Sequence, residues 1–476
     1  FTAADGARFA PLSFSYSLAA ADPVVGDVAS GVAFTRYSLD FGAFQAYTTT
    51  FTLAEGVRHV DFQSTDNLGH LELLRGATVF VDAAAPLTAL GIGAPQFTSG
   101  GTVYVSTATP FSLAAQDPTV AGVASGVSGI SFQLDAAAFG PYLAVFTIPA
   151  PDGPRSVSWF ASDNVGNAEA VRTASVALDA TAPRSSLLVI GGRQAAGPDA
   201  ATFYASLDTR VAFMGEDPMT GGAASGLALI RYQDNGGAFQ NFAAPPALGE
   251  GRHALGYQAQ DNVLNLEILR STTVLVDATP PVTAVSMGAP TFTAVDGTIY
   301  ITPATPVAFS ADDPSLPSGE PGSGVDRIEI SVDGSIYAAV NAPLTFSEGV
   351  HTVRYRALDR VGNVEAAREL LLRSDATPPA SELAIGVPSF QLSSTTVLVS
   401  SMTPLSIAAQ DPTVNGVASG VSETFYRVFG VSPSTATFQV FTASFSLSGA
   451  DTTSFIEFYS RDQVLNTQPV RSRTLL

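Results

Sequence analysis

The chain has 476 residues, no cysteine, 42 acidic and 22 basic residues, and a formal net charge of −20. These values exclude disulfides, thiolate metal sites and a cysteine nucleophile, and an acidic chain is repelled by nucleic acid and by anionic membranes. All 22 basic residues are arginine, so lysine-based Schiff bases and isopeptide crosslinks are excluded. No apolar run approaches the ~18 residues of a membrane span, and the low charged fraction of 13% favours packing against other molecules.

Along the chain, the first recurring element is an Asp-Pro pair followed by Ser-Gly. It occurs five times, 95 to 100 residues apart, and the loop sequence DNVGNAE and its variants recur in step with it. Proline-containing linkers such as VDATPP close the units. A fixed period predicts a repeat array in which each unit contacts only its neighbours. The predicted units are residues 1–82, 83–179, 180–277, 278–375 and 376–476.

Within each unit the apolar residues alternate with a period of two, which indicates strands. After Ser-Gly, for example, the alternation runs through Ile130, Phe132 and Leu134. Turn sequences of the Asp-Gly and Glu-Gly type separate the strands. About seven short strands per unit and the absence of a helical period predict an all-β fold: five immunoglobulin-like β-sandwich domains in tandem, stacked as an extended rod.

The loop motif follows a predicted strand in every unit, and its seven positions differ in what they require. Position four is Gly in three units but Leu264 and Leu465 in the others, so we expect no positive φ there. Position five is Asn or His70, residue types that tolerate the left-handed conformation, so we predict that conformation at position five. Position seven is Glu in four units and Gln468 in the fifth, which argues against an obligatory carboxylate ligand. Position ten is always Arg, expected to cover apolar strand surface or to pair across strands.

The topology of a seven-strand sandwich brings aspartates together at each junction between units. The second and sixth strands run toward the pole where the preceding linker ends, so the loops after both strands meet that linker. Three carboxylates are then expected at each of four junctions. These predicted groups are Asp82, Asp117 and Asp163; Asp179, Asp217 and Asp261; Asp277, Asp313 and Asp359; and Asp375, Asp411 and Asp462.

Two interpretations of these aspartate groups remain open. Aspartate before proline and in tight loops commonly accepts hydrogen bonds from nearby backbone N–H groups, which would make the residues turn caps. Like charges in close proximity also favour a cation, and calcium takes six to eight oxygen ligands. The loop lacks the spacing and the closing glutamate of an EF-hand. The sequence therefore predicts either capping or a calcium site at these residues, and no other cofactor.

The remaining chemistry-bearing residues do not form an enzyme motif. His59, His253 and His351 occupy one position, where the second unit has Ser156. Neither a Ser-centred elbow, a metal-binding histidine pair nor a phosphate-binding glycine loop is present. We therefore expect no enzymatic activity. Four aromatic residues in a short strand are candidates for a glycan-stacking surface, although large aromatic side chains more often belong to the core: Tyr47, Tyr142, Phe242 and Phe441.

The first unit differs from the others at its start. Phe1 and Phe292 lie at equivalent places, each 21 residues before an Asp-Pro pair, so the counterpart of residues 282–291 is missing from the first unit. The first unit is therefore predicted to lack its first strand. The chain is then expected to be a window onto a longer array, and donation of a strand by a neighbour is the alternative.

One stretch of the fourth unit, IEISVDGSIYAAVNAPLTFSEGVHTVRYRALDRVGNVE at 328–365, carries a resemblance to a known family. It resembles the bacterial immunoglobulin-like repeats of large surface proteins, among them leptospiral outer-membrane proteins, large adhesins and modules attached to secreted glycan-active enzymes. The resemblance extends over the whole chain, once per unit, and is weakest in the fifth unit, at VFGVSPSTATFQVF. It implies an extracellular or cell-surface protein, and calcium at the junctions, as in some such adhesins.

Together, the residues and the resemblance predict a non-catalytic structural protein of the bacterial cell surface, forming a stalk, filament or sheath. The expected partners are identical chains that pack laterally, with a glycan or host protein as a further candidate. An adhesin or glycan-binding array, or accessory domains of a larger secreted enzyme, are the alternatives.

Overall fold

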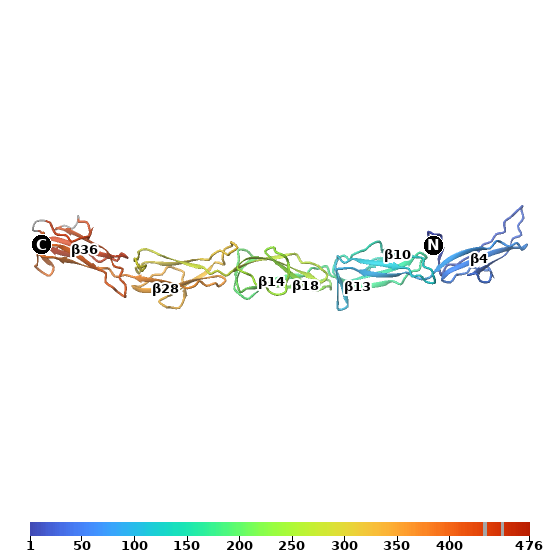
Figure 1. Ribbon diagram of the computed structural model, residues 1–476, viewed down its shortest axis with the longest axis horizontal. Helices are drawn as coiled ribbons and strands as arrows, with labels where there is room; N and C mark the ends of the chain where they lie inside the picture. The colour runs from blue at the N-terminus through green and yellow to red at the C-terminus, as the bar shows by residue number, and fades with distance from the viewer. Residues whose placement is uncertain (432–435, 449–451) are drawn as a thin grey trace.

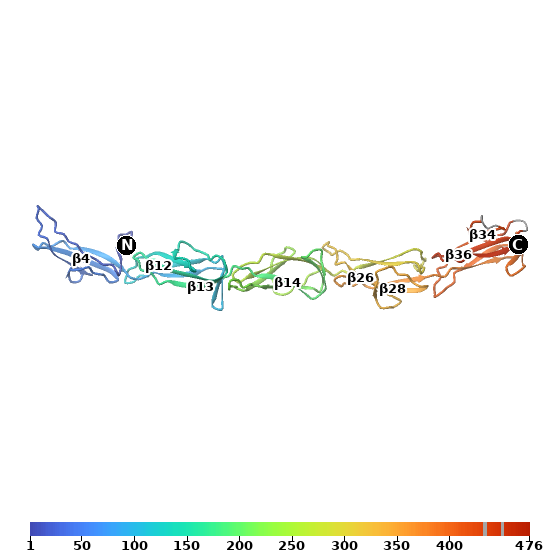
Figure 2. The same ribbon diagram turned by 180° about the vertical axis from the view of Figure 1, so that it is seen from behind.

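The computed structural model describes residues 1–431, 436–448 and 452–476, and these residues form strands and turns without a helix. Five all-β units follow one another along a single long axis, as expected for a tandem array of immunoglobulin-like sandwiches (Figures 1 and 2). The N-terminal residue lies at the end of the first unit that faces the second, and the C-terminus lies in the last unit. Within the described ranges, no helix could cross a membrane.

The third unit shows the architecture of a complete repeat, in which a two-stranded sheet packs against a six-stranded one. The small sheet pairs β14 (Arg184–Ile190) with β17 (Arg210–Glu216) in antiparallel fashion. In the large sheet the order is β15-β16-β21-β20-β18-β19, and only the pair of β16 and β21 is parallel. Its strands are β15 (Gln194–Ala196), β16 (Thr202–Ser206), β18 (Leu227–Asp234), β19 (Gln240–Asn241), β20 (Gly251–Asp261) and β21 (Arg270–Asp277).

The second, fourth and fifth units repeat this sheet order with small changes in strand length. The second comprises β6 (Leu87–Ile92), β7 (Gln96–Ser99), β8 (Thr102–Val105), β9 (Phe111–Gln116), β10 (Val127–Leu134), β11 (Gly140–Pro141), β12 (Gly153–Asp163) and β13 (Arg172–Leu178). The fourth comprises β22 (Val282–Met287), β23 (Thr291–Thr293), β24 (Ile299–Ile301), β25 (Val307–Asp312), β26 (Val325–Val332), β27 (Ala338–Ala339), β28 (Gly349–Asp359) and β29 (Arg368–Ser374). The fifth comprises β30 (Ala380–Ile385), β31 (Ser389–Gln391), β32 (Thr396–Val399), β33 (Leu405–Gln410), β34 (Val421–Phe429), β35 (Gln439–Val440), β36 (Ser454–Asp462) and β37 (Arg471–Leu475).

The parallel pair that closes the large sheet differs in length between units. It joins five residue pairs between β16 and β21, three between β24 and β29, and two each between β8 and β13 and between β32 and β37. The strand before it, β15 or its counterpart, forms a short antiparallel hairpin with β16 or its counterpart.

The core of each sandwich is built on the strand that precedes the loop motif. In the third unit Leu255, Tyr257 and Ala259 are buried on one face of β20, large near its start and small near its end, as the alternation predicts. They pack with Val211 and Phe213 of β17. Burial of each such large apolar side chain contributes about 1.5–3 kcal/mol, so this layer fixes which face of β20 points inward.

The strand inventory differs from the predicted seven strands per unit. A complete repeat has eight strands, because β15 and β16 form an additional hairpin before β17. The segment between β19 and β20 forms only one bridge, between Arg210 and Ala247. Pro245 and Pro246 precede Ala247 and have no N–H to donate to a ladder, which explains why this edge strand stays short in the third unit.

The first unit contains a single sheet in the order β1-β5-β4-β2-β3, and all of residues 1–82 are described. Its strands are β1 (Phe9–Pro11), β2 (Val32–Leu39), β3 (Gln45–Ala46), β4 (Gly56–Asp66) and β5 (Arg75–Asp82). Residues 16–21, which correspond to β9 of the second unit, form only the bridge between Tyr16 and Phe51. Within residues 1–82, residues 16–21 therefore have no ladder partner.

The fifth unit departs from the pattern of the other units at its insert, VFGVSPSTATFQVF. Residues 432–435 and 449–451 of that unit lie outside the described residues. Around them, β34, β36 and β37 pair in the same order as their counterparts in the third unit.

Candidate functional site: the junction between units

The structure brings the twelve predicted aspartates together in four groups of three. In each group one carboxylate oxygen from each residue lies within 4.8 Å of the others. One aspartate ends the preceding unit's last strand or directly follows it, one follows the strand equivalent to β17, and one ends the strand equivalent to β20. The groups are Asp82 with Asp117 and Asp163, Asp179 with Asp217 and Asp261, Asp277 with Asp313 and Asp359, and Asp375 with Asp411 and Asp462.

Every member of the group at the second junction accepts backbone hydrogen bonds. Asp179 accepts from Ser225 N at 2.6 Å, and Asp217 accepts from Gly226 N at 2.7 Å. Asp261 uses Oδ1 for two donors, Val263 N at 3.0 Å and Asn265 N at 2.8 Å. Asp179 and Asp261 are fully buried. The aspartates thus cap the loops that meet at the junction.

These caps do not use all the acceptors. Oδ1 of the aspartate in the Asp-Pro pair is buried without a hydrogen-bond partner at all four junctions, and so is Oγ of the Ser-Gly serine that follows it. An unpaired buried polar group costs about 1–3 kcal/mol, so a recurring pair of them marks a place for an ordered water or an ion. The atoms are Oδ1 of Asp117, Asp217, Asp313 and Asp411, and Oγ of Ser125, Ser225, Ser323 and Ser419.

The charge at the junctions is destabilising when no counterion is present. Burial raises the pKa of Asp313 to about 6 despite the hydrogen bond from Gly324, and repulsion by Asp277 and Asp359 adds to the rise. Burial likewise raises the pKa of Asp411 to about 6 and that of Asp261 to about 6. At neutral pH these carboxylates therefore ionise at a cost to the folded state. The oxygen-rich, buried and anionic donor set fits a hard divalent cation such as calcium.

The loop motif adopts the left-handed conformation at position four, so the prediction for position five is wrong. Leu264 has φ of 68° and Leu465 has φ of 70°, whereas Asn265 has no positive φ. The turn requires a left-handed residue at position four because two sets of hydrogen bonds fix the backbone on either side of it. The N–H of Leu264 donates to the carbonyl of Asp261 at 3.3 Å, and the Asp261 side chain accepts from the N–H groups of positions three and five. His70 also has no positive φ; its ring pairs with Asp66 instead.

The asparagine side chain that recurs at position five has a different role, which residue preferences did not predict. Nδ2 of Asn265 donates to the backbone carbonyl of Asp179 at 2.9 Å and to Oδ2 of Asp261 at 2.7 Å. The loop of one unit is thereby tied to the linker that precedes it. The same two bonds recur at the other three junctions, made by Asn167, Asn363 and Asn466. The signal available in the sequence was the recurrence of asparagine at this position in four of the five units.

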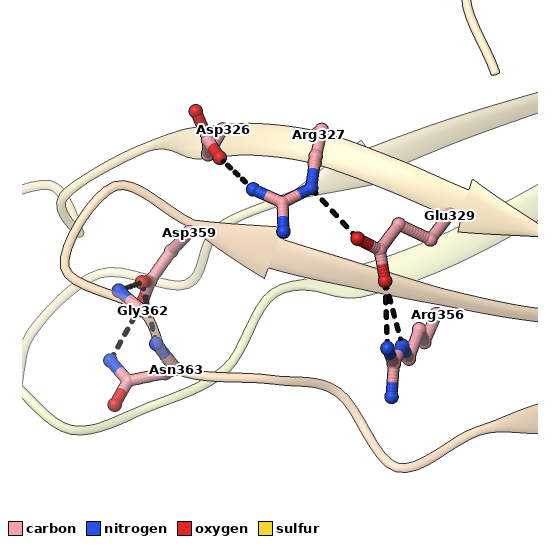
Figure 3. A network of polar contacts seen from close by, with 7 residues as sticks. All are labelled: Asp326, Arg327, Glu329, Arg356, Asp359, Gly362 and Asn363. Carbon is pink, nitrogen blue, oxygen red and sulfur yellow. Dashed lines mark hydrogen bonds and ion pairs between the residues drawn. The ribbon is translucent and has the colours of Figure 1, made fainter. Parts of the chain in front are cut away.

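Figure 3 shows the loop in the fourth unit together with the neighbouring strand surface. Oδ1 of Asp359 accepts from Gly362 N at 2.6 Å and Asn363 N at 2.8 Å. On β26 and β28, Glu329 bridges Arg327 and Arg356 at 2.8 Å each. Such surface ion pairs contribute little to stability. We therefore attribute the stability of the junction to the hydrogen bonds of the loop and not to the ion pairs of Glu329.

The residue at position seven connects the loop to the first strand of its own unit. Glu267 is buried and accepts from Ser185 N at 3.0 Å, from the Ser185 hydroxyl and from Ala259 N at 3.1 Å. Gln468 likewise accepts from Ser381 N at 3.2 Å, so the position needs an acceptor oxygen rather than a charge.

Arg270 at position ten pairs with Glu267 at 2.6 Å. In three other units the equivalent arginine reaches the first strand, as predicted, and donates to a backbone carbonyl there: Arg172 to Thr88, Arg368 to Thr283 and Arg471 to Ser381. Arg368 also lies over the ring of Tyr355, so it covers apolar surface as well.

Successive units are also in direct contact outside the aspartate groups. Thr279 of the third linker donates its hydroxyl to Glu250 at 2.5 Å, in the Glu-Gly turn of the preceding unit. At the third junction Tyr204 and Leu275 of one unit pack with Leu316 and Val361 of the next in a buried apolar cluster. Hydrogen bonds, apolar packing and a short linker therefore all restrict bending between units.

The histidines and the candidate glycan-binding aromatics have structural positions. His253 contacts Asp234 through Nδ1 at 2.6 Å and the carbonyl of Gly249 through Nε2 at 2.9 Å, and His351 makes the equivalent contacts. The four aromatics are half-buried, and three of them pack against the core clusters of their units: Tyr142, Phe242 and Phe441. Tyr47 lies edge-on to Tyr37. They do not form an outward stacking platform.

Comparison with known proteins gives similarity at the level of solved structures. No protein-family model and no curated protein matches the chain. A tetra-tandem repeat from the extending region of a large adhesion protein is similar at 17% identity and a TM-score of 0.24, covering 82% of this chain and 100% of that one. Protocadherin Gamma B2 extracellular cadherin domains 3–6 are similar at 12% identity and a TM-score of 0.20, covering 77% and 98%. Fibronectin(III)-like modules of Clostridium thermocellum CbhA give 15% identity and a TM-score of 0.22, covering 40% and 94%.

The loop geometry predicts opposite effects for two neighbouring glycine substitutions. Leu264→Gly should raise the free energy of unfolding by up to about 1 kcal/mol, because glycine removes the strain of a left-handed non-glycine residue at some cost in chain entropy. Asn265→Gly should lower the free energy of unfolding by about 1–2 kcal/mol, because it deletes the side-chain bond to the linker carbonyl of Asp179 and the bond to Asp261. Calorimetry of the full chain checks both changes. The reverse order would place the left-handed requirement at position five after all.

Proposed function

We propose that the chain is a non-catalytic, extracellular structural rod, a stalk, filament or sheath element of a bacterial cell. The observation that carries this proposal is the junction, because the same set of aspartates, asparagine and linker contacts recurs at four successive places. Four successive junctions that each restrict bending would keep an array of units straight over its length. A protein that served only as a single binding site would not need such repeated junctions.

We further propose that calcium binds at each junction. The recurring unpaired carboxylate and hydroxyl oxygens support this, together with the raised pKa values of the buried aspartates. When bound, calcium would supply positive charge between three carboxylates that otherwise repel one another. The residues that would hold it at the second junction are Asp179, Asp217 and Asp261, with the hydroxyl of Ser225 beside them.

Lateral packing with identical chains completes the proposal. The residue two places after the Glu or Gln of the loop motif is apolar in all five units, and four of these side chains are about half exposed. An apolar patch that returns once per unit matches best a partner with the same repeat length, and a second copy of the chain has that length. These residues, named here the exit patch, are Leu74, Val171, Leu269, Ala367 and Val470.

Negative-stain imaging and small-angle scattering of the full chain test the rod and its packing. We expect straight rods that associate side by side. Replacing Leu74, Val171, Leu269 and Val470 by Glu should leave single rods with an unchanged unfolding temperature, because these side chains are outside the cores. Flexible, bent single chains in both proteins would contradict the rod, and unchanged bundles in the variant would contradict the exit patch.

A further inference from the structure

Each unit carries an aromatic side chain directly before the short strand equivalent to β19. It lies three residues earlier in the chain than the aromatics considered above for a glycan-stacking surface. Three of those later aromatics pack against the cores, whereas none of the earlier ones belongs to a core cluster of the described residues. Phe44 and Phe139 are each 40% exposed, and Phe239 is 39% exposed. These side chains, named here the outer rings, are Phe44, Phe139, Phe239, Tyr337 and Phe438.

The third unit shows how an outer ring is held at the surface. Ile230 and Tyr232 of β18 pack with the core, so Arg231 between them points to the outer side of the large sheet. The guanidinium of Arg231 lies over the ring of Phe239, 4.9 Å from its centre. On β20 the amide oxygen of Gln258, turned toward the guanidinium, accepts from Nε at 2.7 Å. Phe239 is therefore fixed in one orientation, and a partner that binds to it pays little for ordering the ring.

The other outer rings are held in the same way, although the neighbouring side chain changes. In the second unit a second aromatic replaces the guanidinium, and Phe160 lies edge-on to Phe139 with the ring centres 5.1 Å apart. In the remaining units the neighbour is again an arginine. The distances from the guanidinium carbon to the ring centre are 4.8 Å for Arg36 and Phe44, 4.3 Å for Arg356 and Tyr337, and 4.6 Å for Arg427 and Phe438.

The charge beside the ring differs from unit to unit. In the first and third units a neutral glutamine holds the arginine. In the fourth unit Arg356 donates to Glu329 at 3.0 Å, which neutralises the guanidinium (Figure 3). In the fifth unit Arg427 donates to Glu457 at 2.9 Å. The second unit has Phe160 and no charge at this place. Because the ring recurs in every unit and the charge does not, a partner that all five units recognise has to be uncharged.

The surroundings of the ring select among the partners that stack on an aromatic side chain, which are nucleobases, aromatic side chains and sugar rings. The net charge of −20 repels a nucleic acid. Two copies of the chain that met through this same surface would place the Arg231 side chains of both copies against each other. A sugar ring presents C–H groups to the face of the phenyl ring and hydroxyls at its own edge. The amide of Gln258 and the N–H groups of Arg231 provide hydrogen-bond partners for such hydroxyls.

We propose that the outer rings bind a neutral glycan, with one short stretch of sugar units on each repeat. This activity goes beyond the structural rod and does not depend on lateral packing or on calcium. A single exposed ring offers little contact area, so each site alone binds weakly. Five sites along one chain become effective together when the polysaccharide is long enough, or dense enough on a surface, to reach several of them at once. The rod would then be held along a polysaccharide layer through many weak contacts.

Native gel electrophoresis of the full chain in gels that contain a neutral polysaccharide tests the proposal. The probes are a soluble β-glucan, an α-mannan and a galactan, and heparin is the anionic control. We expect at least one neutral polymer to retard the chain, and heparin to have no effect. The chain is run at a concentration at which it migrates as single rods, so that the result does not depend on lateral packing. Retardation by none of the three neutral polymers, or equal retardation by heparin, would overturn the proposal.

Two fivefold variants separate stacking on a ring from general apolar contact. Replacing all five outer rings by Leu keeps apolar side chains but removes the flat rings, and it should weaken binding of the retarding polymer ~10-fold or more. Exchanging the four Phe for Tyr, and Tyr337 for Phe, keeps every ring and should retain binding within a few-fold. Both variants should unfold within a few degrees of the natural chain, because the outer rings lie outside the core clusters.

The matched control is Phe390→Leu, which removes a ring that is 65% exposed and is not an outer ring. This control should bind the polymer as the natural chain does. Unchanged binding by the fivefold Leu variant would show that the outer rings are not the site. Loss of binding in the variant that keeps every ring, or an equal loss in the Phe390 control, would likewise contradict the proposal.

Discussion

Removal of calcium at neutral pH is expected to lower the unfolding temperature of the chain by roughly 10 °C or more. A ligand that is present at ~100 times its dissociation constant stabilises its site by about 2.7 kcal/mol, and 1 kcal/mol shifts the unfolding temperature of a ~100-residue domain by about 4–8 °C. The effect is expected at four junctions, because the unpaired oxygens recur at all four. Calorimetry with calcium and with a chelator measures it.

The stabilisation by calcium should disappear at acidic pH, because the aspartates of the junctions are then protonated. Without a cation, Asp261, Asp313 and Asp411 have pKa values of about 6 in the folded chain, above the ~3.9 of an unfolded aspartate. Between those values the folded state holds more protons than the unfolded state. Stability from these groups is therefore complete below about pH 4 and is lost as the pH rises through 6. Bound calcium would take the place of these protons. It should therefore reduce the loss of stability at neutral pH and add little stability at about pH 4.

A fourfold variant separates binding from general salt effects. Replacing the four aspartates of the Asp-Pro pairs by Asn leaves an oxygen that can accept from Gly226 N and its equivalents, and removes one charge per junction. The added amide can donate to the neighbouring carboxylates. In the chelator this variant should therefore unfold at or above the temperature of the natural chain, and calcium should no longer raise it. A natural chain that shows neither a calcium shift nor heat on titration would leave the aspartates as caps alone. The residues are Asp117, Asp217, Asp313 and Asp411.

Replacing Asp261 by Ala should lower the free energy of unfolding of the third unit by about 3 kcal/mol. The carboxylate is fully buried and satisfies the N–H groups of Val263 and Asn265 and the amide of Asn265. Each buried donor left without a partner costs about 1–3 kcal/mol, and relief of repulsion from Asp179 offsets part of the loss. Denaturant unfolding, followed by hydrogen exchange on β20, measures the change.

The matched control for this substitution is Asp261→Asn. It keeps Oδ1 for the two backbone donors and removes the charge, but it loses the bond from Nδ2 of Asn265, so its cost should be about 1 kcal/mol, well below that of Ala. Equal destabilisation by Ala and Asn would mean that the charge, and not the cap, stabilises the loop. No effect of either would contradict the assignment of this residue as a cap.

Much of the fold could be predicted because the sequence repeats five times. Comparison of Leu255, Tyr257 and Ala259 with their equivalents identifies the buried face of one strand, and the sandwich topology then implies that Asp179, Asp217 and Asp261 converge. The short hairpin of β15 and β16 could not be predicted because strands of three to five residues leave no detectable alternation.

The details of the loop could not be predicted from residue preferences. Leucine at position four suggests a right-handed backbone, yet Leu264 is held left-handed by hydrogen bonds that the aspartate and the backbone make together. Asn265 is placed by its side-chain bond to a carbonyl 86 residues earlier in the chain, a contact that no local pattern reports. Local propensity is overridden where several tertiary contacts agree.

The parallel pair that closes each large sheet sets how a unit would respond to a pull along the rod. The chain enters a unit near one pole and leaves at the other, so tension loads β16 and β21 in opposite directions along their length. All the hydrogen bonds of a parallel pair then share the load at once, instead of breaking one after another. With five paired residues against three in the fourth unit and two in the second, the third unit should unfold at a higher force than those two units, which would extend before it.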